Sequence, residues 1–362
     1  MSWSWTLYRY LARQFLVGVA VVYSGLLMLA FSIDVVDLLN RTGGRTSTLM
    51  VVGMAILYLP SLAQKMMPFA VLGGGVFAFM RLSRSQELVA TRAAGVSAWD
   101  FLAPPLVVAV LLGIAAVTGF TLISSSMLGQ YFPLEARYVK GQPSRLAISE
   151  NGLWLRQGDE TQQSVIHAAR AANQGEQLTD VMVILYRAND KFDGRIDARD
   201  AQLQPGHWEL HDAWVTDSNG AKQHRDQYEL PTTLTSAQIE ASFTPPDALS
   251  FWDLRGFIRT ARAAGFSPIR YELYFYTLLA LPALFAAMVF MAASFSLHTS
   301  RAGGLGRMVL FSALAGFGVY FFNQLTTTLG QNAIIPVLLA ATAPAATAIL
   351  IGMTLVFHQE DG

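Results

Sequence analysis

Residues 57–80 read LYLPSLAQKMMPFAVLGGGVFAFM, and residues 81–97 continue as RLSRSQELVATRAAGVS. The first stretch is long and apolar enough to cross a bilayer as a helix, which takes about 20 such residues. The second stretch is charged and rich in helix-forming residues, and another apolar run follows at 101–123. This boundary predicts two membrane helices that are joined on one side of the membrane by a short charged helix.

The composition of the whole chain agrees with a membrane protein. Of its 362 residues, 53% are hydrophobic and 14% are charged, whereas soluble domains carry about 25% charged residues. The segments long enough to span are roughly 15–33, 57–80, 101–123, 274–295, 308–329 and 334–357. The first is longer than the apolar part of a signal peptide, so we interpret it as a retained span. We expect a membrane α-helical protein with six transmembrane helices, three before and three after an insert.

The insert lies between the third and fourth spans and has a different pattern. About two-thirds of the charged residues of the chain fall between residues 133 and 272. Short runs such as DVMVILYR at 180–187 alternate apolar and polar residues, and Gly, Asn and Asp separate the runs. Period-2 alternation with frequent turn residues predicts an all-β sandwich or open roll. Residues 251–262 instead place apolar residues at helical spacing, which predicts an amphipathic helix at the membrane interface.

These patterns divide the chain into three parts. Residues 1–132 hold the first three transmembrane helices, with the charged helix at 82–95. Residues 133–250 form the inserted β domain. Residues 251–362 hold the interfacial helix and the last three transmembrane helices.

Basic residues near the spans predict the orientation of the protein in the membrane. The arginines that flank the spans on one side are Arg9, Arg13, Arg81, Arg84, Arg92, Arg301 and Arg307. Short cytoplasmic loops carry an excess of Lys and Arg, so this side should be cytoplasmic. Both termini are then cytoplasmic, and the β domain lies on the opposite side of the membrane.

Several classes of chemistry find no support in the sequence. The chain has no cysteine, which excludes disulfides and thiolate metal sites, and its net charge of zero gives no electrostatic reason to expect nucleic acid. None of its four lysines belongs to a G-x-x-x-x-G-K-[ST] phosphate-binding loop, so any ATP hydrolysis must come from another polypeptide. We expect no catalytic residue, no resident metal and no cofactor in this chain.

One stretch leaves an enzymatic alternative open. In HWELH at 207–211, residues His207, Glu209 and His211 would share one face of a strand. Two-residue spacing on a strand can build a zinc triad, as in a membrane-anchored periplasmic metal enzyme. A solvated strand face explains the same residues and is favoured here.

Polar residues within the spans have two interpretations each. Lys65 is expected near the outer boundary of the second span, where it either extends to the interface or contacts an anionic lipid headgroup. Asp37 and Arg41 lie one helical turn apart at the end of the first span, which favours a salt-bridged helix end. Glycines 73–75 favour close packing between helices, with a hinge as the alternative.

The charged helix at 82–95 is the best candidate for a functional site. A helix lying flat on anionic lipid would explain its arginines but not its carboxylate. Because spans flank it closely, a push on this helix would move the second and third spans together. A docking helix for a separate ATPase is therefore the favoured interpretation. Its candidate coupling residues are Arg84, Glu87, Leu88, Thr91 and Arg92.

The layout and several motifs resemble a known family. The motifs are SRSQELVATRAAG at 83–95, NGLW at 151–154 and PDALSFWDL at 246–254, and the spans are grouped as three, a β domain and three. Together they resemble the lipopolysaccharide-export permeases of the LptF/LptG type, and the LptG branch is the better match. The resemblance covers the whole chain.

The resemblance implies a function and a set of partners. The implied function is a permease subunit of an ATP-driven exporter in the bacterial inner membrane, which extracts lipopolysaccharide from the outer leaflet and passes it to a periplasmic β-jellyroll bridge. The implied partners are an LptF-like permease, a cytoplasmic LptB-like ATPase dimer that binds ATP and Mg, an LptC-like single-span jellyroll protein and an LptA-like bridge. The inserted β domain would itself be jellyroll-like and periplasmic. A mechanotransmission subunit that moves no lipid between its spans is the alternative.

The resemblance also implies roles for individual residues. Glu87 matches the glutamate of the coupling helix that faces an arginine of the ATPase, and Arg84 matches a basic residue before it. Asp37, Arg41 and Arg137 fall near the path of the lipid headgroup, and Lys65 is added to this group as a headgroup contact.

This chain departs from the family at two positions. Members often carry a lysine where Asp34 stands and a basic residue where Ser61 stands. Lys65, one turn beyond Ser61, is expected to compensate.

Overall fold

The computed structural model divides the protein into two compact units. It describes residues 5–44, 46–87, 91, 95, 97–139, 153–158, 162–172, 175–187, 191–218, 220–232, 245–263, 267–296 and 305–360. The membrane unit comprises residues 1–128, 249–252 and 269–362, and the β unit comprises residues 129–248 and 253–268. A short segment after residue 252 thus belongs with the insert.

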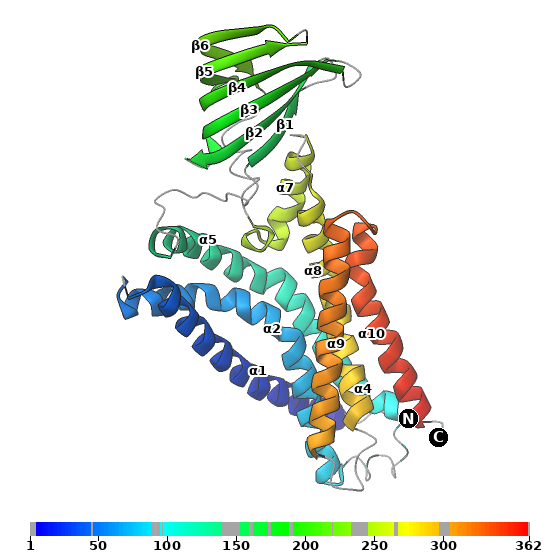
Figure 1. The fold of residues 1–362 in the computed structure, drawn as a ribbon. Helices are drawn as coiled ribbons and strands as arrows, with labels where there is room; N and C mark the ends of the chain where they lie inside the picture. The colour runs from blue at the N-terminus through cyan, green and yellow to red at the C-terminus, as the bar shows by residue number, and fades with distance from the viewer. Residues whose placement is uncertain are drawn as a thin grey trace. The chain divides into compact units, whose positions relative to one another are not determined.

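Six helical spans make up the membrane unit (Figure 1). They are α1 (Trp5–Thr42), α2 (Thr48–Arg84), α4 (Ala98–Ala115) continued through the π-helical η1 (Ala116–Phe120) into α5 (Thr121–Tyr138), α8 (Ile269–Ser296), α9 (Leu305–Gln331) and α10 (Val337–Glu360). A helix satisfies all its backbone hydrogen bonds internally, which a bilayer requires. The six predicted spans in a three-plus-three arrangement are confirmed.

Helix α8 is the centre of the membrane unit. Within its apolar stretch 61% of the residues are buried inside the structure, compared with 6% in α1 and 17% in α9. It packs against α2, α4, α9 and α10. The outer helices α1 and α9 therefore keep wide apolar faces that the described residues leave uncovered.

Small residues bring the helices of the membrane unit into close contact. A Cβ at Gly74 would overlap the backbone of Val19 in α1, and a Cβ at Gly75 would come within 2.9 Å of the Ala292 Cβ in α8. A Cβ at Gly113 of α4 would lie 2.5 Å from the Pro282 Cα of α8. Close packing at the glycines of α2 is therefore confirmed.

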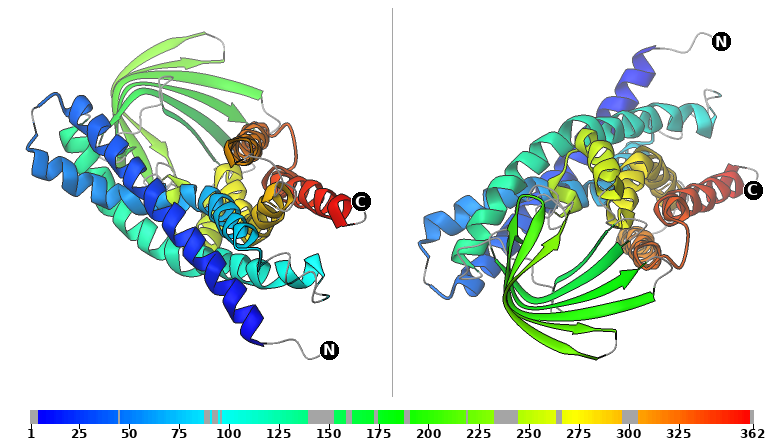
Figure 2. Two further views of the ribbon diagram at one scale, coloured as in Figure 1. Left: turned by 90° about the horizontal axis from the view of Figure 1, so that it is seen from below. Right: turned by 90° about the horizontal axis from the view of Figure 1, so that it is seen from above.

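The β unit is built on one antiparallel sheet of six strands. They are β1 (Leu153–Gly158), β2 (Gln162–Ala172), β3 (Gln177–Arg187), β4 (Lys191–Gln204), β5 (His207–Asp217) and β6 (Lys222–Pro231). The strands pair in chain order, each with its neighbours in sequence. The all-β prediction is confirmed, and the described strands form one curved sheet rather than a two-sheet sandwich (Figure 2).

The sheet curls into an open roll with an apolar inner face. Ile196, Trp208 and Leu210 are fully buried on that face, in a core that draws on strands β2 to β6. The buried Gln157 side chain of β1 donates a hydrogen bond to the Pro231 carbonyl (3.1 Å) and accepts one from the Thr232 hydroxyl. This clasp joins the first strand to the end of the last, so the two edges of the sheet meet at one end.

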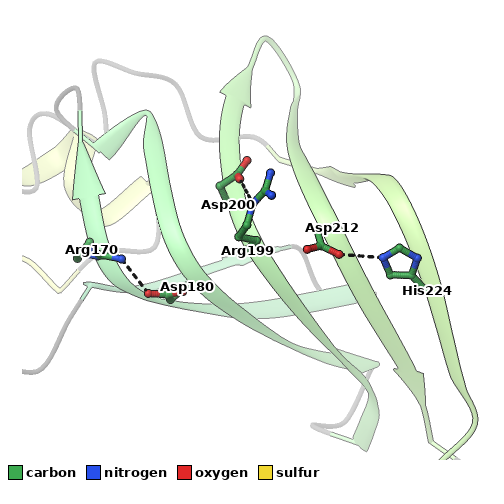
Figure 3. A network of polar contacts seen from close by, with 6 residues as sticks. All are labelled: Arg170, Asp180, Arg199, Asp200, Asp212 and His224. Carbon is green, nitrogen blue, oxygen red and sulfur yellow. Dashed lines mark hydrogen bonds and ion pairs between the residues drawn. The ribbon is translucent and has the colours of Figure 1, made fainter.

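The outer face of the roll is polar, and strand pairing is interrupted along a line across the sheet. Asp180 and Asp212 have left-handed backbones with φ of 54°, and regular pairing is interrupted at their level in the neighbouring strands. Ion pairs on this face join Arg170 to Asp180 (3.2 Å) and Arg199 to Asp200 (3.0 Å), and a hydrogen bond joins His224 to Asp212 (2.8 Å; Figure 3). Exposed pairs of this kind contribute about 0–1 kcal/mol each, so this face is a solvated surface.

Two short helical elements connect the β unit back to the membrane unit. A single 3-10 turn, η3 (Pro246–Ala248), precedes α7 (Phe251–Ala263). The amphipathic helix predicted at 251–262 is therefore confirmed as a helix.

The contact of α1 with α2 can be tested by adding one methyl group. Gly74→Ala should lower the free energy of unfolding by about 1–3 kcal/mol, because the new Cβ overlaps the Val19 backbone. Gly25→Ala is the matched control, since no neighbouring atom lies within 4 Å of a Cβ there. Thermal unfolding in detergent measures both. Equal midpoints for the two variants would contradict this contact.

Candidate functional site: the charged end of the helical hairpin

The helix expected at 82–95 does not begin at Leu82. Helix α2 runs on to Arg84, and Leu82 is buried in it with 2% of its surface exposed. Ser85 then ends α2, with its N–H donating to the Arg81 carbonyl (3.0 Å). Gln86 follows in a left-handed backbone conformation with φ of 59°. An αL residue stops a helix, so the charged segment starts anew after this turn.

The segment after the turn is helical where the structure describes it. Glu87 and Thr91 are helical, and the Thr91 hydroxyl donates to the Glu87 carbonyl (2.6 Å), one turn earlier. Gly95 has φ of 82°, as expected of the glycine that ends a helix. Leu88 and Arg92 lie outside the described residues. Arg84 is exposed in the last turn of α2, and Glu87 is half-buried.

A contact with the first helix was not predicted from the sequence. The Tyr10 hydroxyl of α1 donates a hydrogen bond to the Glu87 Oε2 at 2.8 Å, across 77 residues of chain. The two residues meet because α1 and α2 are antiparallel, so the beginning of α1 lies beside the end of α2 (Figure 1). The only local signal was an aromatic residue between the arginines that precede the first span.

The opposite end of the hairpin holds other predicted site residues. Arg41 pairs with Asp37 at 2.8 Å, one turn apart, so the predicted salt bridge is confirmed. About half of each side chain is exposed, and such a pair contributes only a few tenths of a kcal/mol. Lys65 is exposed and lies nearer the middle of α2 than its end.

Two buried polar atoms lie between the ends of the hairpin. The Asp34 Oδ2 and the Ser61 Oγ have no hydrogen-bond partner among the described residues. Val22 lies beside Gly73 where the helices are in contact, and Asp34 and Ser61 are each about 18 Å along the helix axis from that point, in the same direction. The two positions at which this chain departs from the expected basic pattern are therefore at one level of the hairpin.

Arg137 is assigned to a different unit from these residues. It belongs to the part of α5 that forms the β unit, and its guanidinium lies over the Tyr138 ring, 5.4 Å from the centroid.

The segment that follows the β strands contacts the π-helical part of the third span. The Trp252 indole donates to the Thr118 carbonyl (3.1 Å), which lies in the π-helical η1. Phe251 stacks on Phe275 of α8, with ring centroids 5.2 Å apart and planes 8° apart. The PDALSFWDL motif thus includes the two aromatic residues that hold the return segment to the third and fourth spans.

The zinc alternative fails on geometry. His207 and His211 lie on β5, where residues four apart are separated by about 13 Å, too far to share one ion. Across the strands, Glu209 faces Gln202 and Glu229. Within the described ranges, no three His, Asp or Glu side chains come together as metal ligands. A solvated strand face accounts for HWELH.

Sequence comparison agrees with this architecture. The sequence model of the family described as "Lipopolysaccharide export system permease LptF/LptG" matches residues 9–357. The chain belongs to the LptF/LptG family. It is 23% identical over 360 residues to the lipopolysaccharide export system permease protein LptG of Escherichia coli (strain K12), covering 97% of this chain and 98% of that protein. The LptG protein of Escherichia coli O6:H1 (strain CFT073) matches equally. The resemblance is confirmed, and this LptF/LptG chain is a permease subunit for lipopolysaccharide export.

The absence of a zinc site in HWELH can be measured directly. Protein purified without chelators should carry well under one equivalent of zinc by elemental analysis. His207→Ala and His211→Ala should leave both this content and the unfolding temperature nearly unchanged, because both side chains lie on a solvated strand face. Stoichiometric zinc that disappears in either variant would restore the enzymatic alternative.

Proposed function

We propose that this permease subunit works with a separate cytoplasmic ATPase dimer that docks on the segment from Arg84 to Gly95. The ATPase binds ATP and Mg, and its movement drives extraction of lipopolysaccharide from the outer leaflet of the inner membrane. The observation that carries this proposal is the charged connection between two spans. Arg84 is exposed in the last turn of α2, and Glu87 and Thr91 are helical after the turn that follows it. Arg84, Glu87, Leu88, Thr91 and Arg92 are the proposed docking residues.

The thermodynamics of extraction supports an external energy source. Moving acyl chains from a bilayer into water costs about 0.8 kcal/mol per CH₂. A lipid with several chains therefore needs both a shielded apolar path and work from outside the subunit. This chain contains no phosphate-binding loop that could supply the work.

Uncovered apolar faces support a second permease as a partner. Met28, Leu29 and Ile33 of α1 are exposed by 75%, 59% and 61%. Phe317 and Phe321 of α9 are each exposed by 63%. In a bilayer such faces contact lipid, cargo or another membrane protein, and an LptF-like permease would complete a cavity around the glycolipid.

The β unit suits the next step of the path. Its inner face is apolar, and among the described strands β1 and β6 lie at the two edges of the sheet, each with a neighbour on one side. An unpaired strand edge can pair with a strand of another protein. We propose that LptC-like and LptA-like jellyroll proteins extend the roll into a bridge across the periplasm.

The orientation of the subunit follows from its basic residues. Arg9 and Arg13 at the start of α1 and Arg81 and Arg84 at the end of α2 lie at one end of the hairpin. This end is proposed to be cytoplasmic together with both termini, and the β unit periplasmic.

Four residues are proposed to contact the lipid headgroup. Asp37 and Arg41 lie at the opposite end of the hairpin, Lys65 lies near the middle of α2, and Arg137 belongs to the β unit. Arg41 and Lys65 supply the positive charge for phosphate or acidic sugars.

A mechanotransmission role remains the second candidate because of one observation. The Trp252 hydrogen bond to Thr118 gives the third span a direct connection to the segment that leads back from the β unit. Movement could pass along this connection without any lipid entering between the spans.

Reversing the charge of Glu87 tests ATPase docking. Glu87→Lys should weaken binding of the ATPase more than tenfold, because breaking a buried charged contact at an interface costs about 2–5 kcal/mol. Co-purification of the ATPase in mild detergent measures the effect, and Glu229→Lys on the exposed part of β6 is the matched control for charge reversal. Normal ATPase binding by a folded Glu87→Lys permease would refute the docking site.

Photocrosslinking separates the two candidate functions. A photoactivatable residue at Lys65 or Asp37 should capture lipopolysaccharide in the assembled complex, because both side chains are exposed near the proposed headgroup path. Leu339, exposed by 54% on α10, is the control position. Labelling no stronger at Lys65 and Asp37 than at Leu339 would favour mechanotransmission.

A further inference from the structure

The hydrogen bond between Tyr10 and Glu87 joins a firmly packed helix to the first residue after the turn that ends α2. Next to Tyr10 in α1, Leu11 is 3% exposed, and Phe15 is fully buried. The Phe15 ring reaches the position of Gly75 in α2. Tyr10 therefore projects from a part of α1 that is fixed by core packing.

Glu87 itself is half-buried and lies outside that core. It follows an exposed turn at Ser85 and Gln86, and Gln86 adopts the left-handed conformation that costs a non-glycine residue free energy. Within the described ranges, the 2.8 Å bond from the Tyr10 hydroxyl is the one long-range hydrogen bond of the Glu87 side chain.

The Tyr10 bond engages one of the two oxygens of the Glu87 carboxylate. Among the described residues, the hydroxyl donates to Oε2 at 2.8 Å, and no hydrogen bond to Oε1 is present. Tyr10 thus holds Oε2 of Glu87, while a carboxylate can accept about four hydrogen bonds over its two oxygens. Oε1 can still receive a cationic group from a docking protein.

We propose that Tyr10 is a positioning residue for ATP-driven transport, which orients the Glu87 carboxylate for docking and ties α1 to the docking segment. The inference rests on the proposed function, because it assigns Glu87 to the ATPase interface. Chain connectivity alone would carry movement of the segment into α2 and α4. The Tyr10 bond adds α1, the helix with the widest exposed apolar face, to the elements that move together.

Tyr10→Phe tests this role by removing one oxygen and keeping the ring. In the full-length permease without ATPase, amide hydrogen exchange in residues 87–95 should become about fivefold faster, because a net hydrogen bond of about 1 kcal/mol is lost. Tyr320→Phe is the matched control. Tyr320 is half-exposed on α9, and its ring contact with Phe69 (centroids 5.8 Å apart) survives the change. Unchanged exchange in Tyr10→Phe would overturn the proposal.

A double-mutant cycle with the assembled complex tests positioning itself. Tyr10→Phe should weaken ATPase binding about threefold to tenfold in the wild-type background, and much less in a Glu87→Gln background, where the charged acceptor is already lost. An equal loss in both backgrounds would show that Tyr10 does not act through Glu87, and would overturn the proposal.

The two inferences can fail separately. Normal ATPase binding by Glu87→Lys would remove the docking site and, with it, the transport role of Tyr10. Faster exchange in Tyr10→Phe would then still establish the contact between α1 and the segment, because that measurement needs no ATPase.

Discussion

The close antiparallel contact of α1 with α2 determines what meets at both ends of the hairpin. Gly74 lies against the backbone of Val19, and no side chain larger than hydrogen fits between them without a shift. Because the two helices cannot slide past each other at this point, their register is fixed along their whole length. At one end this register brings Tyr10 to Glu87, and toward the other it sets Asp34 level with Ser61. The proposed docking site and the Asp37–Arg41 end of the hairpin thus share the same packing contact.

This arrangement suggests how work could travel through the subunit. A conformational change requires contacts that differ between two states, not merely a binding event. In the proposed mechanism, the turn at Ser85 and Gln86 sets the docking segment apart from the end of α2, and a push on the segment would reach α2 through this turn. The Tyr10 hydroxyl would connect the same movement to α1. The Tyr10–Glu87 hydrogen bond is weak enough to break during a conformational change and strong enough to favour the state in which it is formed.

The β unit must bury the apolar face of a single sheet, and a few contacts hold it in the shape that does so. A single sheet must bury its apolar face to be stable, and here it does so by curling on itself. The Gln157 side chain closes the roll at one end through Pro231 and Thr232, whereas charged pairs keep the outer face in water. The left-handed residues Asp180 and Asp212 interrupt pairing in a line across the strands. Such irregularities increase local twist and bending, which a curved sheet needs.

The sequence by itself determined the six spans, the all-β insert, the family and the salt bridge of Asp37 with Arg41. All of these depend on local patterns: apolar length, period-2 alternation, and charges one helical turn apart. The tertiary structure decided that the charged helix starts after Gln86 rather than at Leu82, because the conformation of one residue breaks it. It also decided that Tyr10 meets Glu87 and that Trp252 meets the π-helical turn, since these contacts join residues far apart in the chain. HWELH shows the same division: its spacing put three ligand types on one face, but the rise of a strand holds them too far apart to share a metal ion.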